Sequence, residues 1–222
     1  MAAPAGTANP KGGRREHATR VRFHPPERSK RDPRKTRERI MAAVVESIAE
    51  VGFHRTSGAE IAKRAGVTWG AVQHHFGDKN GILIAVLEDS FNRLLDRLAT
   101  VDPALALEER VSQFIDRAWE HFATGHHRST YEILNHYASV DPELTFQAQA
   151  GAALARSWAT LFGDSRISRR RQLVLQRYAI SLLSGLASVR AFGMPERENV
   201  EAERQLLKDT LVRELRPRAG AG

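Results

Sequence analysis

The 222-residue chain contains no cysteine, which excludes disulfides, thiolate metal sites and cysteine nucleophiles. It also lacks any apolar run near the roughly 18 residues of a membrane span, and its first residues lack the apolar centre of a signal peptide. We therefore expect a cytoplasmic protein with no membrane association. With 41% apolar residues, the chain has enough apolar surface to bury a sizeable core.

Acidic residues are scarce at the start of the chain. Residues 1–37 hold 11 Lys and Arg against three acidic residues. This difference equals the whole formal net charge of +8. The same residues include five of the nine prolines. Such a segment cannot bury enough apolar surface to offset its ordering entropy, so we predict a basic, disordered arm over residues 1–32. Basic arms often bind nucleic acid or anionic surfaces. The alternatives are a solubilising tail or, less compatible with the clustered prolines, an organelle transit peptide.

From Pro33 onward, apolar residues recur at helical spacing, with no alternating strand pattern and no internal repeat. The first helix begins at Pro33 and ends before Gly52. Gly66 separates two short helices. The turn between them is expected to need a positive φ, which glycine adopts without a steric penalty. The predicted later helices cover about 58–65, 68–76, 79–99, 106–124, 128–139, 142–162, 168–192 and 195–215. The sequence therefore predicts an all-α fold.

The segment "TWGAVQHHF", residues 68–76, carries an unusual Trp-Gly pair. Val72 and Phe76 lie one turn apart and face inward. The residues predicted on the opposite, exposed side are Trp69, Gly70, Gln73 and His74. In a helix-turn-helix, the second helix enters the DNA major groove by its N-terminal residues, so a glycine allows close approach and an indole offers apolar surface to a thymine methyl. The alternative is an ordinary helical hairpin whose tryptophan packs on a neighbouring subunit.

The segment "RIMAAVVESIAEVGFHRTSGAEIAKRAGVTWGAVQHHFGDKNGILIAVLEDSF" resembles the DNA-binding region of TetR-family transcriptional regulators, whose pattern is "GF…T…IA..AGV..G..Y.HF..K..L". The resemblance implies a three-helix helix-turn-helix DNA-binding domain at 33–79 and a larger helical ligand-binding and dimerisation domain at 80–222. It also implies phosphate contacts from Thr56, Ser57 and Lys79. The same resemblance places Thr68, Trp69 and Gly70 closest to the bases.

Two further residues of the short helix, Gln73 and His74, are expected to bond phosphates or a base edge. Gln73 stands where the family usually has tyrosine, so it departs from the pattern there. The neighbouring histidine pairs His74-His75 and His126-His127 cannot chelate alone, because adjacent helical residues point apart. We expect no metal site and no cofactor.

The resemblance implies that the C-terminal bundle binds a small-molecule effector and forms a homodimer. The candidate ligand-binding residues are aromatic or polar residues of the middle helices: Phe91, Trp119, Phe122, Tyr131, Asn135, Tyr137 and Trp158. The candidate dimerisation residues form two apolar stripes on the last helices: Leu182, Leu183, Leu186, Val189, Leu207 and Leu211. Either stripe is also compatible with a place in the core.

The function implied is that of a transcriptional repressor that binds a palindromic operator in double-stranded DNA as a dimer and leaves it when an effector binds. An architectural DNA-binding protein without sequence preference is the main alternative, because a basic arm alone confers non-specific affinity. A helical enzyme is less compatible with the sequence. No nucleophile context, glycine-rich phosphate loop or paired carboxylates stand out.

Overall fold

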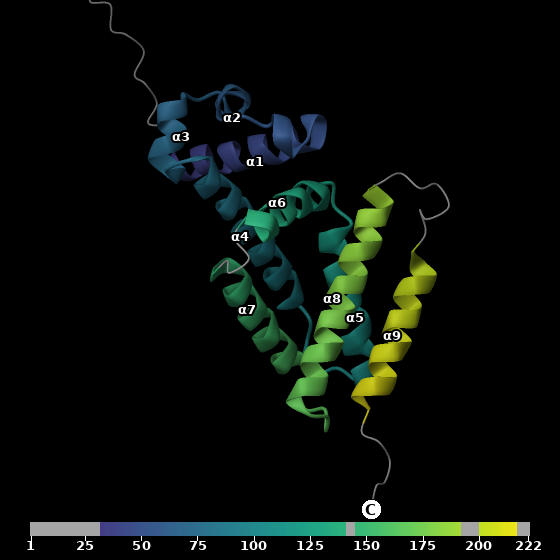
Figure 1. The fold of residues 1–222 in the computed structure, drawn as a ribbon. Coiled ribbons are helices and arrows are strands. Elements are labelled where there is room, and N and C mark those ends of the chain that lie inside the picture. The colour runs from purple at the N-terminus through teal and green to yellow at the C-terminus, as the bar shows by residue number, and fades with distance from the viewer. Residues whose placement is uncertain (1–31, 141–144, 192–199, 217–222) are drawn as a thin grey trace, which may run out of the picture. The chain divides into compact units, whose positions relative to one another are not determined.

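The computed structural model describes residues 32–140, 145–191 and 200–216. Within these ranges the regular structure is entirely helical, so the all-α prediction is confirmed (Figure 1). The elements are α1 (Pro33–Val51), the 3-10 turn η1 (Phe53–Arg55), α2 (Gly58–Ala65), α3 (Trp69–Phe76), α4 (Lys79–Leu98), α5 (Leu107–Phe122), α6 (His126–Val140), α7 (Thr145–Phe162), α8 (Arg169–Ala191) and α9 (Glu201–Leu215). Apart from Asp32, the predicted basic arm lies outside the described residues.

The first helices begin and end where side-chain chemistry dictates. Ser57, Thr68 and Asp78 each accept a hydrogen bond from the backbone N–H three residues ahead, at 3.2, 3.2 and 2.8 Å, and so cap α2, α3 and α4. Gly66 ends α2 with a φ of 60°, the left-handed conformation that glycine adopts without penalty. These caps fix a short turn between α2 and α3.

Buried side chains form two clusters. The first joins α1, η1, α2, α3 and the first half of α4, and its fully buried members include Ile40, Ile48, Ile61, Val72 and Ile82. The second joins the other half of α4 to α5, α7, α8 and α9, and its members include Leu98, Phe114, Trp158, Phe162 and Leu183. The helix α4 contributes to both clusters.

By its contacts, the chain from Pro33 onward is one compact unit. The domain boundary between residues 79 and 80 therefore stays a prediction. None of the helices in the described ranges offers a stretch long and apolar enough to cross a membrane.

The helix α6 packs on the first cluster, where Ile133 and Tyr137 are buried. Three hydrogen bonds reinforce this contact: Ser129 Oγ to the Val45 oxygen (2.9 Å), the Phe53 N–H to Glu132 Oε2 (3.1 Å), and the Tyr137 hydroxyl to the Asn80 oxygen (3.1 Å). Near the start of α6, His127 Nε2 lies 3.3 Å from both the Ser184 oxygen and Ser188 Oγ of α8. The helix thus contacts both the first cluster and α8.

Candidate nucleic-acid interface

The helices α2 and α3 form a helix-turn-helix. The Gly66 and Val67 N–H groups close the turn onto carbonyl oxygens of the last turn of α2, at 3.1 and 3.0 Å. Val72 then turns inward and is fully buried. Gly70, Gln73 and His74 are exposed, on the face where the sequence placed them. The motif therefore presents the start of α3 to solvent.

Trp69 departs from the expectation of an exposed side chain. It is half-buried, packs against the first cluster, and its six-membered ring covers Gly58 of α2. A Cβ atom built at residue 58 would lie 2.7 Å from Trp69 Cζ3, so the ring occupies the space that a side chain would need. The short turn brings the first residue of α3 against the start of α2. The indole that was predicted to be exposed is therefore only partly exposed.

Thr56 also departs from its expected role. Its side chain is 1% exposed, and its hydroxyl lies 3.0 Å from both the Gly52 oxygen and Ser47 Oγ. A hydroxyl held in this way stabilises the turn between α1 and α2 and cannot reach a phosphate. The phosphate contact predicted for the Thr56 side chain is therefore corrected to a structural role, whereas Ser57 and Thr68, both exposed, keep their places beside the helix starts.

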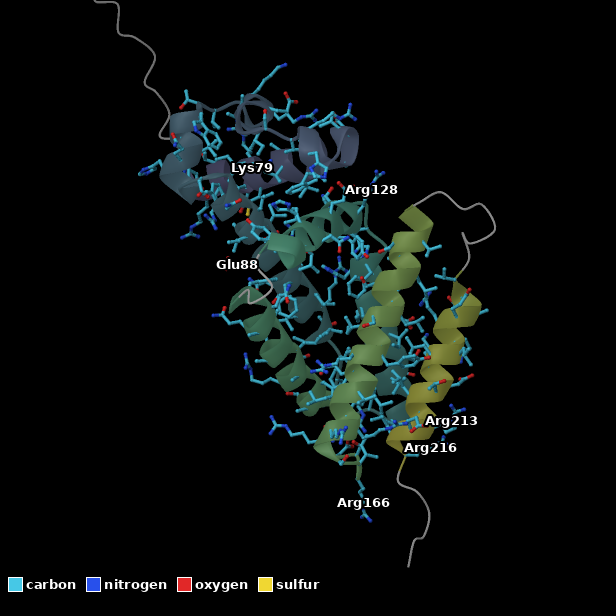
Figure 2. The ribbon with its side chains drawn as sticks, viewed as in Figure 1. Lys79, Glu88, Arg128, Arg166, Arg213 and Arg216 are labelled. Carbon is cyan, nitrogen blue, oxygen red and sulfur yellow. The ribbon has the colours of Figure 1, made fainter. Side chains whose placement is uncertain are left out.

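Lys79 lies at the first position of α4, where Figure 2 labels it. Its ammonium is 5.1 Å from the centroid of the Phe53 ring, a cation–π arrangement, and burial lowers its pKa from the usual value. The side chain is only partly exposed in this conformation. Its phosphate contact stays a prediction that requires the ammonium to leave the ring.

Two arginines of α1 also shape the motif, and the sequence reasoning missed both. The Arg37 guanidinium lies 4.3 Å from the Phe76 ring centroid and donates to the His75 oxygen at 3.3 Å, while Arg39 donates to the Ala65 oxygen. Each places positive charge at the C-terminal end of a short helix, where the helix dipole favours cations. The signal available in the sequence was the run of basic residues at the start of the first predicted helix.

The predicted ligand-binding residues do not surround one cavity. Trp158, Phe122 and Tyr137 are buried in the two clusters, and the Tyr137 hydroxyl is already bonded to α4. Tyr131 and Asn135 are exposed. The remaining two are half-buried at separate places: Phe91 in a groove with α7, and Trp119 under the Arg204 guanidinium of α9. Most members of the set thus serve the packing between helices in this structure, and a role in ligand binding stays a prediction.

The predicted dimerisation residues divide into two groups. Leu183, Leu207 and Leu211 are 0% exposed and belong to the second cluster, so they are corrected to core residues. The others, Leu182, Leu186 and Val189, are half-buried. Large apolar side chains that do reach the surface of α8 and α9 are Val174, Tyr178 and Leu206, which are 47%, 44% and 64% exposed.

The motif and the helical bundle behind it define a helix-turn-helix DNA-binding protein. Residues 40–86 match the family model described as bacterial regulatory proteins, tetR family. The resemblance of residues 39–91 is confirmed, because this region matches the DNA-binding region of TetR-family transcriptional regulators. The relatives and the fold are those of regulators and not of enzymes.

Similarity to curated proteins is concentrated in the N-terminal region. The chain is 39% identical over 83 residues to the HTH-type transcriptional regulator BetI of Escherichia coli O17:K52:H18, which covers 36% of this chain and 43% of that protein. It is 45% identical over 60 residues to BetI of Escherichia coli K12, which covers 27% of this chain and 31% of that protein. The matches thus span less than half the length of these relatives.

Solved structures extend the similarity to most of the chain. A transcriptional regulator from Rhodococcus sp. Rha1 is 25% identical with a TM-score of 0.61, and covers 81% of this chain and 93% of that chain. Salmonella enterica GusR shares the fold, with 20% identity, a TM-score of 0.67, and coverage of 83% of this chain and 97% of that chain.

Proposed function

We propose that this protein is a transcriptional repressor that binds a palindromic operator as a dimer, through the N-terminal residues of α3, and leaves it when a small molecule binds. Its place of action would be the cytoplasm, with the DNA. The observation that carries the DNA-binding part is Gly70. A Cβ atom at this position would meet nothing closer than Thr68 Oγ1 at 3.9 Å, so packing within the described chain does not require glycine.

Glycine in an exposed helix costs about 1 kcal/mol relative to alanine. A glycine that the protein's own packing does not need is explained by a surface outside the chain that approaches the α3 backbone closely. The major groove is such a surface, because the start of a recognition helix lies in it. Gly70 therefore supports insertion of this end of α3 into DNA.

The other residues of α3 have distinct proposed roles. Trp69 packs against Gly58 of α2 with its six-membered ring, and its exposed part would contact a sugar or a thymine methyl. The exposed Gln73 and His74 would bond base edges or phosphates. Ser57, at the start of α2, would contact a phosphate through its hydroxyl and the helix N-terminus.

Operator release requires a path from the second cluster to α3. The helix α4 contributes to both clusters, as Figure 1 allows the reader to follow, and α6 packs on the first cluster while His127 contacts α8. In a dimer, the two recognition helices must lie about one DNA turn apart, roughly 34–36 Å. An effector shifts the equilibrium only by binding one spacing more tightly than another.

The proposed DNA contact is tested by Gly70→Glu, which places bulk and negative charge where DNA would lie. The wild-type protein is first used to select duplexes from a random pool, and a palindrome is expected to emerge. Gly70→Glu should bind the selected duplex no better than scrambled DNA. The matched control is Gly151→Glu, the same change at an exposed helical position of α7 with nothing within 4 Å.

Retained preference for the selected duplex in Gly70→Glu, with normal helicity, would refute the assignment of α3 as the recognition helix. Selection that yields no enriched sequence would instead identify an architectural DNA-binding protein.

A further inference from the structure

A cavity of about 570 Å³ lies between α1, α4, α5 and the start of α6. Its volume falls within the range of about 300–1,000 Å³ that is typical of small-molecule sites. None of the ligand-binding residues predicted from the sequence lines it. Its walls come from both clusters, since α1 belongs to the first cluster and α5 to the second.

One side of the cavity is apolar. Met41, Ala42 and Val45 of α1 line it together with Val86 of α4. Met41 and Val45 are half-buried and Ala42 is exposed. An apolar ligand that covers these side chains buries apolar surface and desolvates no polar group of theirs. The hydrophobic effect therefore favours an alkyl group at this wall.

The other side carries positive charge and hydrogen-bonding groups. Arg93 and Arg97 of α4, His121 of α5 and His127 of α6 line it. The acidic residues of the lining are Glu38 and Asp89. Arg93 pairs with Asp89, and Arg97 pairs at 3.1 Å with Glu120, which does not line the cavity. Both pairs are exposed, so each contributes little and is readily exchanged for a ligand.

His121 is a half-buried imidazole on this side of the cavity. Burial is the main cause that lowers its pKa to about 4, and the positive charges of His127, Arg97 and Arg93 lower it further. Its Nε2 lies 3.5 Å from Ser90 Oγ. The neutral His121 imidazole carries one N–H, which can donate a hydrogen bond to a carboxylate.

The two sides are displaced along α4. Val86, Ser90, Arg93 and Arg97 recur at helical spacing along one face of this helix. At about 1.5 Å per residue, the distance from Val86 to Arg97 is about 16 Å along the axis. The cavity therefore suits an elongated molecule with an apolar end and an anionic end.

We propose that this cavity binds an alkyl carboxylate, with the alkyl chain against Met41, Val45 and Val86 and the carboxylate beside Arg97 and His121. A guanidinium matches a carboxylate because its N–H groups form a planar fork. The occupant would contact α1, α4 and α6 at once, and of these α1 and α4 contact α3 directly. The role of the cavity as the effector site rests on the proposed function. The binding of an alkyl carboxylate to the cavity does not.

Binding is tested by calorimetry on the full chain without DNA, using octanoate and its uncharged analogue octanamide. Octanoate should bind, and octanamide should bind at least about tenfold more weakly, because one charge-assisted pair is lost. Arg97→Gln should weaken octanoate binding by a similar factor. The matched control is Arg117→Gln, since Arg117 pairs with the same Glu120 at 2.9 Å but does not line the cavity.

A second variant tests the apolar wall independently of charge. Ala42→Trp adds a large side chain at an exposed position of α1 and should block octanoate binding without unfolding the protein. The His121 ring resonances should shift with octanoate in the wild type and not in this variant. Absence of octanoate binding, or equal binding by the wild type and both Arg97→Gln and Ala42→Trp, would overturn the site.

The role as effector site is measured separately on the selected duplex. Octanoate should lower operator affinity in the wild type and in Arg117→Gln, but not in Ala42→Trp. If octanoate binds the free protein and leaves operator affinity unchanged, the cavity is not the effector site. If the protein selects no duplex at all, the proposed function fails while the binding result stands.

Discussion

His121 shows how one buried side chain couples the protein's stability to pH. Its ring lies in α5 beside Ser90 of α4, and burial lowers its pKa from 6.5 to about 4. Burial also lowers the pKa of His127. Both imidazoles are therefore neutral in the folded protein under conditions in which the unfolded chain already binds protons.

We predict that the unfolding free energy falls as the pH decreases from 6.5 to about 4 because of His121. Above pH 6.5 the ring is neutral in both states and contributes nothing to the pH dependence, and below the folded pKa both states are protonated. The expected loss from this residue is on the order of 1–3 kcal/mol. Urea denaturation at several pH values measures it.

The control is His121→Gln, which keeps a polar side chain and removes the titration. The variant should lose less stability than the wild type over the same pH interval. Parallel pH profiles for the two proteins would show that the His121 ring is already solvated in the native state.

At the scale of elements, the contact between α2 and α3 depends on Gly58. The Trp69 ring lies where a Cβ atom of residue 58 would be, so any larger residue must displace the ring or the helix. The same chain offers a natural comparison in Gly70, where the corresponding space is open.

We predict that Gly58→Ala destabilises the protein by about 1–3 kcal/mol through overpacking. Gly70→Ala should instead leave stability unchanged or raise it by up to about 1 kcal/mol, because alanine is the better helix former. Urea denaturation of both variants beside the wild type checks this. Equal effects of the two substitutions would mean that the Trp69 ring does not pack on α2 as described.

The helices themselves were predictable because local signals specify them. Pro33, Ser57, Thr68 and Asp78 mark helix starts, and apolar spacing marks the buried stripe of each helix. The exposed face of α3 was likewise predictable for Gly70, Gln73 and His74.

Which neighbour covers each stripe was not predictable, because periodicity does not distinguish a core from an interface. Leu183, Leu207 and Leu211 follow the pattern of a dimer contact and lie in the second cluster. For the same reason, the packing of Trp69 on Gly58 was not predictable from the sequence. The α1/α4/α5/α6 cavity was also missed, since its lining comes from helices distant in sequence.

At the scale of the whole molecule, the exposed apolar residues of α8 and α9 define the candidate dimer surface. Val174 and Tyr178 lie one turn apart on α8, and Leu206 is an exposed apolar residue of α9. A Cβ atom at Gly185, further along α8, would meet nothing within 4 Å. Small and apolar residues together allow close approach of a second copy, and a symmetric dimer matches a palindromic operator.

We predict that the wild type sediments as a dimer and that Tyr178→Glu produces a folded monomer, because it places a charge in the apolar interface. Leu183→Glu should unfold the protein instead, since that side chain is fully buried. The control is Tyr131→Glu, the same change at an exposed tyrosine of α6, which should stay dimeric. An unchanged mass for Tyr178→Glu, with normal helicity, would place the interface elsewhere.

The basic arm before Pro33 adds a prediction that rests on charge alone, since residues 1–31 lie outside the described part of the chain. Flexible Arg and Lys side chains neutralise phosphates and release counterions without holding a base-specific geometry. Each neutralised phosphate adds about 0.9 to the magnitude of the slope of log affinity against log salt concentration.

If about three or four arm charges engage DNA, deletion of residues 1–30 should flatten that slope by about 3 and leave the ranking of operator variants unchanged. Salt titrations of the full-length and shortened proteins, on selected and scrambled duplexes, measure both quantities. Identical slopes would show that the arm does not contact DNA. A changed ranking would show that the arm reads sequence, as homeodomain arms do by entering the minor groove.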